Sequence, residues 1–196
     1  YGTAIGAVYA TLFPERTRAM VLDGSVSPGG SREEELLTQG RGFERTLRNF
    51  VERCNADPRC ALAPDAAAAI EQVRSPLAEE PVTYSDSSGE RTLGVDLFDL
   101  GLATALYDTT AWGTAANAIA TIREGGAGVL LTLVDRQIGR EPDGSFDNST
   151  DARTIVNCSD KRERPSADEA VATARRVAEQ LPGFGSTVAW GALNCV

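Results

Sequence analysis

A helix with one face of small residues stands directly before a short apolar run, and this order constrains the fold more than any other feature. Gly2, Gly6 and Ala10 recur every four residues at the start of the sequence. Small residues at that spacing let a helix approach a neighbouring backbone closely, so we expect this helix to pack on a sheet. The apolar run at residues 19–22 is continuous, as in a buried parallel strand. Helix, strand and polar loop in this order predict an α/β fold over residues 1–30.

A mainly helical pattern begins at Ser31, after the breaker-rich segment S-V-S-P-G-G. Ser31 and Glu34 have the spacing of a capping box, and apolar residues then recur at helical spacing as far as Cys54. Gly40 and Gly42 are candidate kink points. Further helices are predicted at about 65–75, 96–107, 110–123 and 126–138, with a hairpin of 82–84 and 91–93 around D-S-S-G. Residues 31–148 therefore read as a helical insertion.

The last part of the sequence is predicted to return to the α/β portion. A turn-rich linker occupies residues 141–150, and T-I-V-N-C at residues 154–158 has the composition of a strand. Ser166 and Glu169 repeat the capping box before one more amphipathic helix, which Pro182 ends. We expect residues 149–196 to form this return segment.

The four cysteines, an even number without a C-x-x-C pair, allow three disulfide connectivities. We favour Cys54 with Cys60, because the intervening N-A-D-P-R can turn tightly, and this leaves Cys158 to pair with Cys195. Two disulfides would indicate an oxidising, secreted or cell-envelope location. The alternative is four reduced cysteines buried in the core.

Charge and residue usage exclude several classes of function. The net charge of -9 disfavours a nucleic-acid partner, because phosphate binding needs a basic patch. The sequence has no histidine, and its carboxylates show no ligand-like spacing, so no metal site is expected. No glycine-rich phosphate loop follows a strand, and we expect no cofactor.

The opening Y-G-T, the small-faced helix and the following R-A-M-V-L-D-G resemble the nucleophile region of α/β-hydrolases. They are most similar to the actinobacterial tripeptidyl-aminopeptidase branch, related to prolyl aminopeptidases, whose elbow runs G-G-S-Y-G-T and whose next strand ends in L-D-G. C-N-A-D-P-R-C, N-C-S-D and W-G-A-L-N-C also look like that branch, so the resemblance covers nearly the whole chain. It implies a partial α/β-hydrolase fold with a few core strands and a helical lid at residues 31–148.

The resemblance also implies where catalytic groups lie. The serine nucleophile is expected immediately before Tyr1, and the acid and histidine after Val196, in segments that would complete the same hydrolase. The backbone N–H of Tyr1 would help to stabilise the tetrahedral intermediate. Residues 1–196 contain no histidine, so we expect them to be inactive alone. The whole would be a secreted serine hydrolase that releases tripeptides or short peptides from N-termini.

An aminopeptidase must bind a free ammonium, which a carboxylate does well. Asp160 and Glu163, after the expected return strand, are the candidates, with solvated charges beside Lys161 as the alternative reading. Trp112 and Trp190 are expected in the core or the wall of the lid, and stacking on substrate is the other possibility.

Two other functions fit the same residues. One is an esterase or lipase-like hydrolase with the same elbow, because the fold does not determine the acyl group. A requirement for a free substrate amine would separate it from an aminopeptidase. The other is a non-catalytic secreted binding domain in which the match at Tyr1 is a coincidence.

Overall fold

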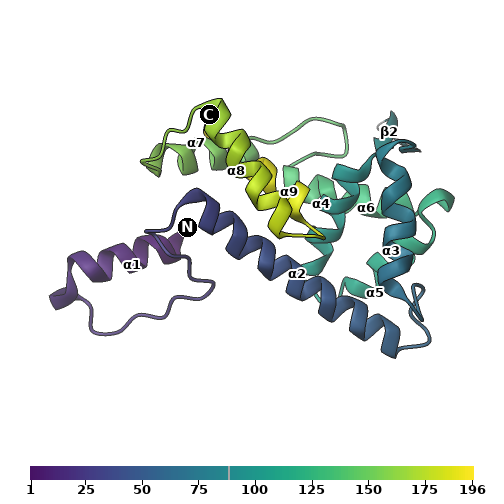
Figure 1. Ribbon diagram of the computed structural model, residues 1–196, viewed down its shortest axis with the longest axis horizontal. Helices are drawn as coiled ribbons and strands as arrows, with labels where there is room; N and C mark the ends of the chain where they lie inside the picture. The colour runs from purple at the N-terminus through teal and green to yellow at the C-terminus, as the bar shows by residue number, and fades with distance from the viewer. Residues whose placement is uncertain (88) are drawn as a thin grey trace.

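The computed structural model describes residues 1–87 and 89–196. Its first helix, α1 (Gly2–Leu12), lies to one side of a larger helical body, followed by the short 3₁₀ helix η1 (Pro14–Arg16) and an extended loop (Figure 1). None of the α1 residues is buried. The helix contacts the loop through Gly6, where an added Cβ would lie 2.8 Å from Cδ2 of Leu22. One member of the predicted small-residue stripe therefore makes a close contact, but with a loop.

The helical body begins at residue 32, and the predicted helices between residues 31 and 138 are confirmed. Its elements are α2 (Arg32–Ala56), α3 (Ala66–Arg74), η2 (Ser75–Ala78), β1 (Val82–Asp86), β2 (Gly89–Leu93), α4 (Val95–Leu106), α5 (Trp112–Ala120), η3 (Ile122–Glu124), α6 (Gly126–Ile138), α7 (Ser149–Asp160), α8 (Ala167–Gln180), α9 (Gly185–Ala189) and η4 (Trp190–Leu193). None of the helices in the described ranges is long and apolar enough to span a membrane.

The predicted hairpin is present, with β1 and β2 antiparallel and Tyr84 opposite Arg91. Ser88, in the expected D-S-S-G turn, lies outside the described residues. Arg91 forms two hydrogen bonds to the carboxylate of Asp135 on α6, at 2.8 and 2.6 Å. Tyr84 lies over Gly128, where an added Cβ would come within 2.4 Å of its ring. The hairpin is therefore held on α6 by an ion pair and a close aromatic contact.

One continuous core lies between α2, α3, α4, α5, α6, α8 and α9, and it contains the large buried side chains Phe50, Phe98, Leu102, Ile119, Leu130, Val177 and Phe184. Helix α2 runs the length of the body, and α8 and α9 lie along it (Figure 1). Trp112 is 8% exposed and packs edge-on against Phe50, with ring centroids 5.6 Å apart, so its expected core position is confirmed.

Helix α2 is continuous through the two glycines that we considered as kink points. Gly40 has a different role, because the side chain of Leu181 packs where its Cβ would be, at 2.2 Å. Gly42 has no neighbouring atom within 4 Å of that position. The predicted capping box at the start of α2 is confirmed, with the Ser31 side chain accepting from the Glu34 N–H.

Both predicted core strands are absent from the described residues, and these predictions are wrong for this structure. Residues 19–22 have no regular structure, and residues 154–158 belong to α7. A strand needs neighbouring strands to satisfy its N–H and C=O groups, and no neighbours are present here. A helix pairs its backbone internally, which explains why β-branched residues such as Ile155 and Val156 adopt α7 instead.

Both favoured disulfides are confirmed. Cys54 and Cys60 are bonded, with their Cα atoms 5.3 Å apart, and Cys158 and Cys195 are bonded with Cα atoms 5.4 Å apart. The first closes the turn after α2, and the second joins α7 to the segment that follows η4.

Candidate functional site

The first turn of α2 is the centre of a polar cluster at one edge of the helical body. The edge cluster, as we call it, consists of Arg32, Glu35, Lys161, Glu163, Arg164 and Gly191. Its members come from α2, from the segment after α7 and from η4, which are far apart in sequence. Side chains and backbone from both ends of the body therefore meet there.

Arg32 joins the three parts of the edge cluster. Its guanidinium donates to the carbonyl oxygen of Gly191 through Nε and Nη2, at 3.2 and 2.8 Å. Its backbone N–H donates to Oε2 of Glu163 at 3.3 Å. This N–H is one of those that a helix leaves unpaired in its first turn, and a carboxylate there also interacts favourably with the helix dipole.

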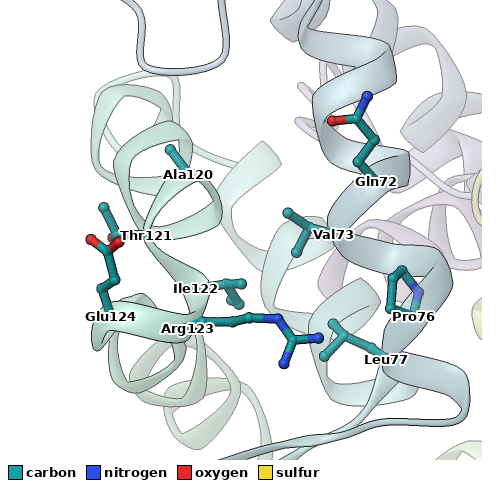
Figure 2. Close-up of a pocket in the computed structure, with 9 residues that line it drawn as sticks. All are labelled: Gln72, Val73, Pro76, Leu77, Ala120, Thr121, Ile122, Arg123 and Glu124. Atoms are coloured by element: carbon teal, nitrogen blue, oxygen red, sulfur yellow. The ribbon is translucent and has the colours of Figure 1, made fainter.

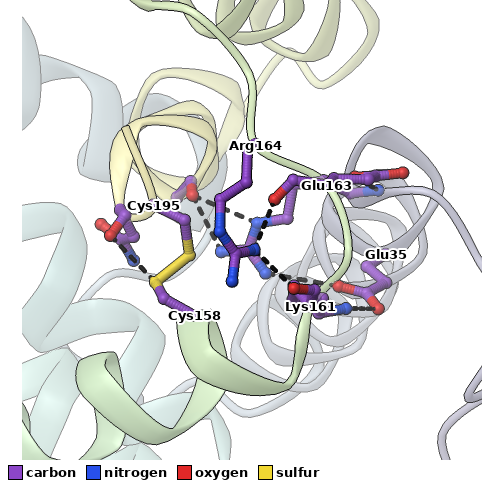
Figure 3. The surroundings of a disulfide bond; sticks show 9 residues. Glu35, Cys158, Lys161, Glu163, Arg164 and Cys195 are labelled. Atoms are coloured by element: carbon purple, nitrogen blue, oxygen red, sulfur yellow. Dashed lines mark hydrogen bonds and ion pairs between the residues drawn. A yellow bond between two sulfur atoms is a disulfide. The ribbon is translucent and has the colours of Figure 1, made fainter.

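The segment after α7 is held against α2 by ion pairs and by the disulfide. Figure 3 shows Lys161 paired with Glu35 beside the Cys158–Cys195 bond. The Arg164 guanidinium donates to the carbonyl oxygens of Lys161 and Glu163, the latter at 2.8 Å, and so fixes the backbone between them. The segment is thus attached at several points although it has no regular secondary structure.

The two carboxylates predicted to bind an ammonium are placed differently. Asp160 is the last residue of α7 and is exposed, and its carboxylate has no hydrogen bond or ion pair to a described residue. Glu163 is also exposed, but its carboxylate already accepts the N–H of Arg32. Lys161, the cation next to Asp160 in sequence, is paired with Glu35. Asp160 is therefore the carboxylate of the two that is available to a ligand.

A second ion pair holds α8 on the first turn of α2. Arg176 donates to Glu33 from Nε and Nη2, at 3.0 and 2.7 Å. This hydrogen bond holds the pKa of the Glu33 carboxyl below its ordinary value. Of the three glutamates in the first turn of α2, Glu33 and Glu35 thus have specific partners, and Glu34 completes the capping box.

Trp190 stands at the start of η4 with its side chain 61% exposed. Its neighbours Ala189 and Ala192 are buried, at 6% and 4%. Gly191 faces α2, because a Cβ there would lie 2.6 Å from Leu36. The backbone around Trp190 is therefore packed on two sides while the indole faces outwards.

Tyr1 is the N-cap residue of α1, and its carbonyl oxygen accepts from the N–H groups of Ala4 and Ile5 at 3.1 and 3.2 Å. Its side chain is 62% exposed. Tyr1 and the edge cluster thus belong to separate parts of the structure, and the structure gives no contact between them.

A pocket of about 320 Å³ lies elsewhere on the body, between α3–η2 and α5–η3. Figure 2 shows Arg123 extending from one side of it towards Pro76 and Leu77 on the other. The side chains that line it include no paired nucleophile and base. In the described part of the chain, no group of three or more His, Cys, Asp or Glu residues is arranged to hold a metal.

The sequence indicated Asp160, Glu163 and Trp190 but gave no sign of Arg32 or Gly191. Their contact joins residues 159 positions apart, and no local pattern reports such a pair. The capping box did mark Ser31 as the start of α2, and so placed Arg32 in the first turn, where an unpaired N–H is expected.

Known proteins with similar sequences point to one fold family. The family described as alpha/beta hydrolase fold matches residues 1–119. The serine protease Hip1 of Mycobacterium tuberculosis is 32% identical over 192 residues, covering 93% of this chain and 36% of that protein. Carboxylesterase B of Mycobacterium tuberculosis is 32% identical over 174 residues, covering 87% and 33%. Tripeptidyl aminopeptidase of Streptomyces lividans is 25% identical over 170 residues, covering 83% and 30%.

Proposed function

Because the chain belongs to the α/β-hydrolase family, we propose that it is part of a secreted serine hydrolase that removes tripeptides or short peptides from free N-termini through an acyl-enzyme. The chain spans about a third of the length of the curated relatives that it matches. A serine protease and a tripeptidyl aminopeptidase are among those relatives, which supports a peptidase.

In this proposal the reacting groups are divided between this chain and the rest of the polypeptide. The sequence holds no histidine, so the general base comes from outside residues 1–196, together with the acid and the serine. Tyr1 follows the serine and supplies a backbone N–H to the oxyanion at the start of α1. Residues 1–196 alone are therefore inactive.

The observation that carries the aminopeptidase assignment is the exposed and unpaired carboxylate of Asp160 beside the edge cluster. The lid, residues 31–148, covers the substrate, and Asp160 binds its terminal ammonium. Glu163 has a positioning role, because it fixes the segment after α7 to α2 through the N–H of Arg32. The two disulfides support an extracytoplasmic location.

The test compares free and N-acetylated peptide substrates with the complete hydrolase. Loss of a hydrogen bond to a charged group costs about 1.5–3 kcal/mol, so Asp160→Asn should lower kcat/KM for free-amine substrates roughly 10- to 100-fold. The acetylated substrate should be cleaved slowly by both proteins. Asp151→Asn, which changes another exposed carboxylate on α7, is the matched control and should have no effect.

An esterase is the second candidate, favoured by the similarity to carboxylesterase B. It would cleave simple acyl esters well, would not distinguish free from acetylated amines, and would be indifferent to Asp160→Asn. Labelling with a fluorophosphonate tests the part that both candidates share. The complete protein should gain one probe by intact mass, and residues 1–196 should gain none. Labelling of the isolated chain would contradict the proposed division of catalytic groups.

A further inference from the structure

The pocket between α3–η2 and α5–η3 combines an apolar lining with one charged side chain that crosses it. Its apolar lining includes the half-buried Val73 and the buried Leu77 and Ile122. Its volume of about 320 Å³ lies at the small end of the range for small-molecule sites, about 300–1,000 Å³. The pocket therefore has room for an aromatic ring or a short acyl chain.

Arg123 is the charged side chain that crosses the pocket. Figure 2 shows it extending from η3 towards Pro76 and Leu77 on the opposite wall. Its guanidinium makes no hydrogen bond, ion pair or ring contact with any residue in the described ranges. A guanidinium carries five N–H donors, and those of Arg123 are all available to a ligand.

The acidic side chains near the pocket do not neutralise this cation. Glu124 also lines the pocket, but in Figure 2 it lies beside Thr121, apart from the Arg123 guanidinium. Glu71, on α3, lies 3.9 Å from Arg74 and accepts a hydrogen bond from the next residue of the chain after Arg74. The pocket thus presents an unpaired positive charge beside apolar side chains.

The backbone that carries Arg123 is fixed by the turn after η3. Gly125 has a φ of 113°, in the left-handed region that glycine adopts readily. The carbonyl oxygen of Thr121 accepts the N–H of Gly126 at 2.9 Å. An added Cβ at Gly126 would lie 2.0 Å from the carbonyl oxygen of Ala118, so the turn packs directly on α5. The wall of the pocket is therefore formed before a ligand binds, which lowers the entropic cost of binding.

We propose that this pocket is a binding site for a small apolar carboxylate, such as the C-terminal residue of an apolar peptide or a short fatty acid. The planar guanidinium of Arg123 pairs with the carboxylate through two hydrogen bonds, and the apolar part of the ligand packs on Val73, Leu77 and Ile122. A carboxylate is favoured over a phosphate because one cation matches its single charge. The site goes beyond the proposed function, since it includes neither Tyr1 nor Asp160.

The test measures binding to the complete protein by isothermal titration calorimetry. The protein is first treated with a fluorophosphonate, so that a reactive serine is already occupied. 3-Phenylpropionate should bind as one molecule per protein, and its uncharged amide should bind at least about tenfold more weakly. Acetate, which has the charge without the apolar body, should also bind more weakly. Between N-acetylphenylalanine and octanoate, the tighter ligand distinguishes a peptide end from a fatty acid as the source of the carboxylate.

Substitutions at Arg123 assign the binding to this pocket. Arg123→Gln should weaken the binding of 3-phenylpropionate about tenfold, at the low end for a hydrogen bond to a charged group because Arg123 is exposed. Arg123→Lys should keep part of the affinity, since it retains the charge but loses the planar fork. Arg48→Gln is the matched control, because Arg48 is an exposed arginine on α2 without a hydrogen bond or ion pair to a described residue.

Four results would overturn the inference. Absence of binding to the wild-type protein would mean that the pocket takes no such ligand, and equal affinity for the acid and its amide would make it a purely apolar hollow. Unchanged affinity in Arg123→Gln would place the ligand elsewhere. An equal loss in Arg48→Gln would attribute binding to overall charge. The measurement requires no turnover, so its outcome is independent of the aminopeptidase assignment.

Discussion

Asp99 on α4 is the only buried charged residue in the described part of the chain. It receives two hydrogen bonds from Arg74 on α3, at 2.7 and 2.8 Å, and one from Thr187 on α9, at 3.2 Å. The hydrogen bond to Asp99 raises the pKa of the Arg74 guanidinium. Three helices are therefore joined at one carboxylate, and its removal leaves a partly buried cation without its main partner.

We expect Asp99→Ala to lower the free energy of unfolding by about 3 kcal/mol, at the low end for a broken buried pair because Arg74 is partly exposed. Glu71→Gln is the control, since Glu71 lies 3.9 Å from Arg74 but is 59% exposed, and it should cost less than about 1 kcal/mol. Urea unfolding of the three proteins measures both values. Equal losses in the two variants would show that burial is not what makes Asp99 important.

At the scale of single residues, the sequence predicted those interactions in which the two residues lie close together in the sequence. The capping boxes at Ser31 and Ser166 are confirmed, and so is the Cys54–Cys60 bond across a short turn. The second disulfide followed by elimination. The partner of Asp99 was not predictable, because the contact depends on how α3, α4 and α9 pack.

At the scale of elements, Gly40 and Gly42 offer a comparison within one helix. An added Cβ at Gly40 would overlap the buried Leu181, whereas at Gly42 it would meet nothing within 4 Å. We expect Gly40→Ala to lower the free energy of unfolding by about 1–2 kcal/mol, because overpacking against Leu181 outweighs the gain in helix propensity. Gly42→Ala should raise the free energy of unfolding by about 0.5–1 kcal/mol, because alanine is more favourable than glycine inside a helix.

Thermal or urea unfolding of the two variants gives the sign of each effect. If both variants gained stability, Leu181 would have room to move and the close contact between α2 and the end of α8 would be of no consequence. If both lost stability, a bend in α2 at the glycines would be indicated.

Helices were predictable and core strands were not, for a physical reason. The pattern of apolar residues every three or four positions is contained within a helix, and α2, α4, α6 and α8 were found near their expected bounds. The apolar runs at 19–22 and 154–158 form strands only beside other strands. Ile155 and Val156 were misread for this reason, since composition alone did not distinguish a strand from α7.

At the scale of the whole molecule, the structure divides into a well-packed body and a poorly covered opening segment. Ile5, Tyr9 and Leu12 of α1 are 57%, 42% and 64% exposed. An isolated helix of 11 residues is marginal in water. In residues 1–196 alone, the amides of α1 should therefore exchange with solvent almost as fast as unstructured peptide, while those of α6 are strongly protected.

Hydrogen exchange followed by mass spectrometry checks this, with α6 as the internal reference. In the complete hydrolase we expect α1 to become protected, because its apolar face would then be covered. Equal protection of α1 and α6 in residues 1–196 would contradict the prediction and would show that the contact of Gly6 with Leu22 is sufficient to hold α1.

The contact of Arg32 with Gly191 has a consequence for how such a body can be exchanged between proteins. The residue at the beginning of α2 touches the last helical turn, so the two ends of the body lie next to each other. Domains with this property are tolerated as insertions, because the host needs only two adjacent attachment points. The body can thus be regarded as a transferable unit, and under the proposed function we expect that grafting it between related hydrolases would change substrate preference without altering the catalytic groups.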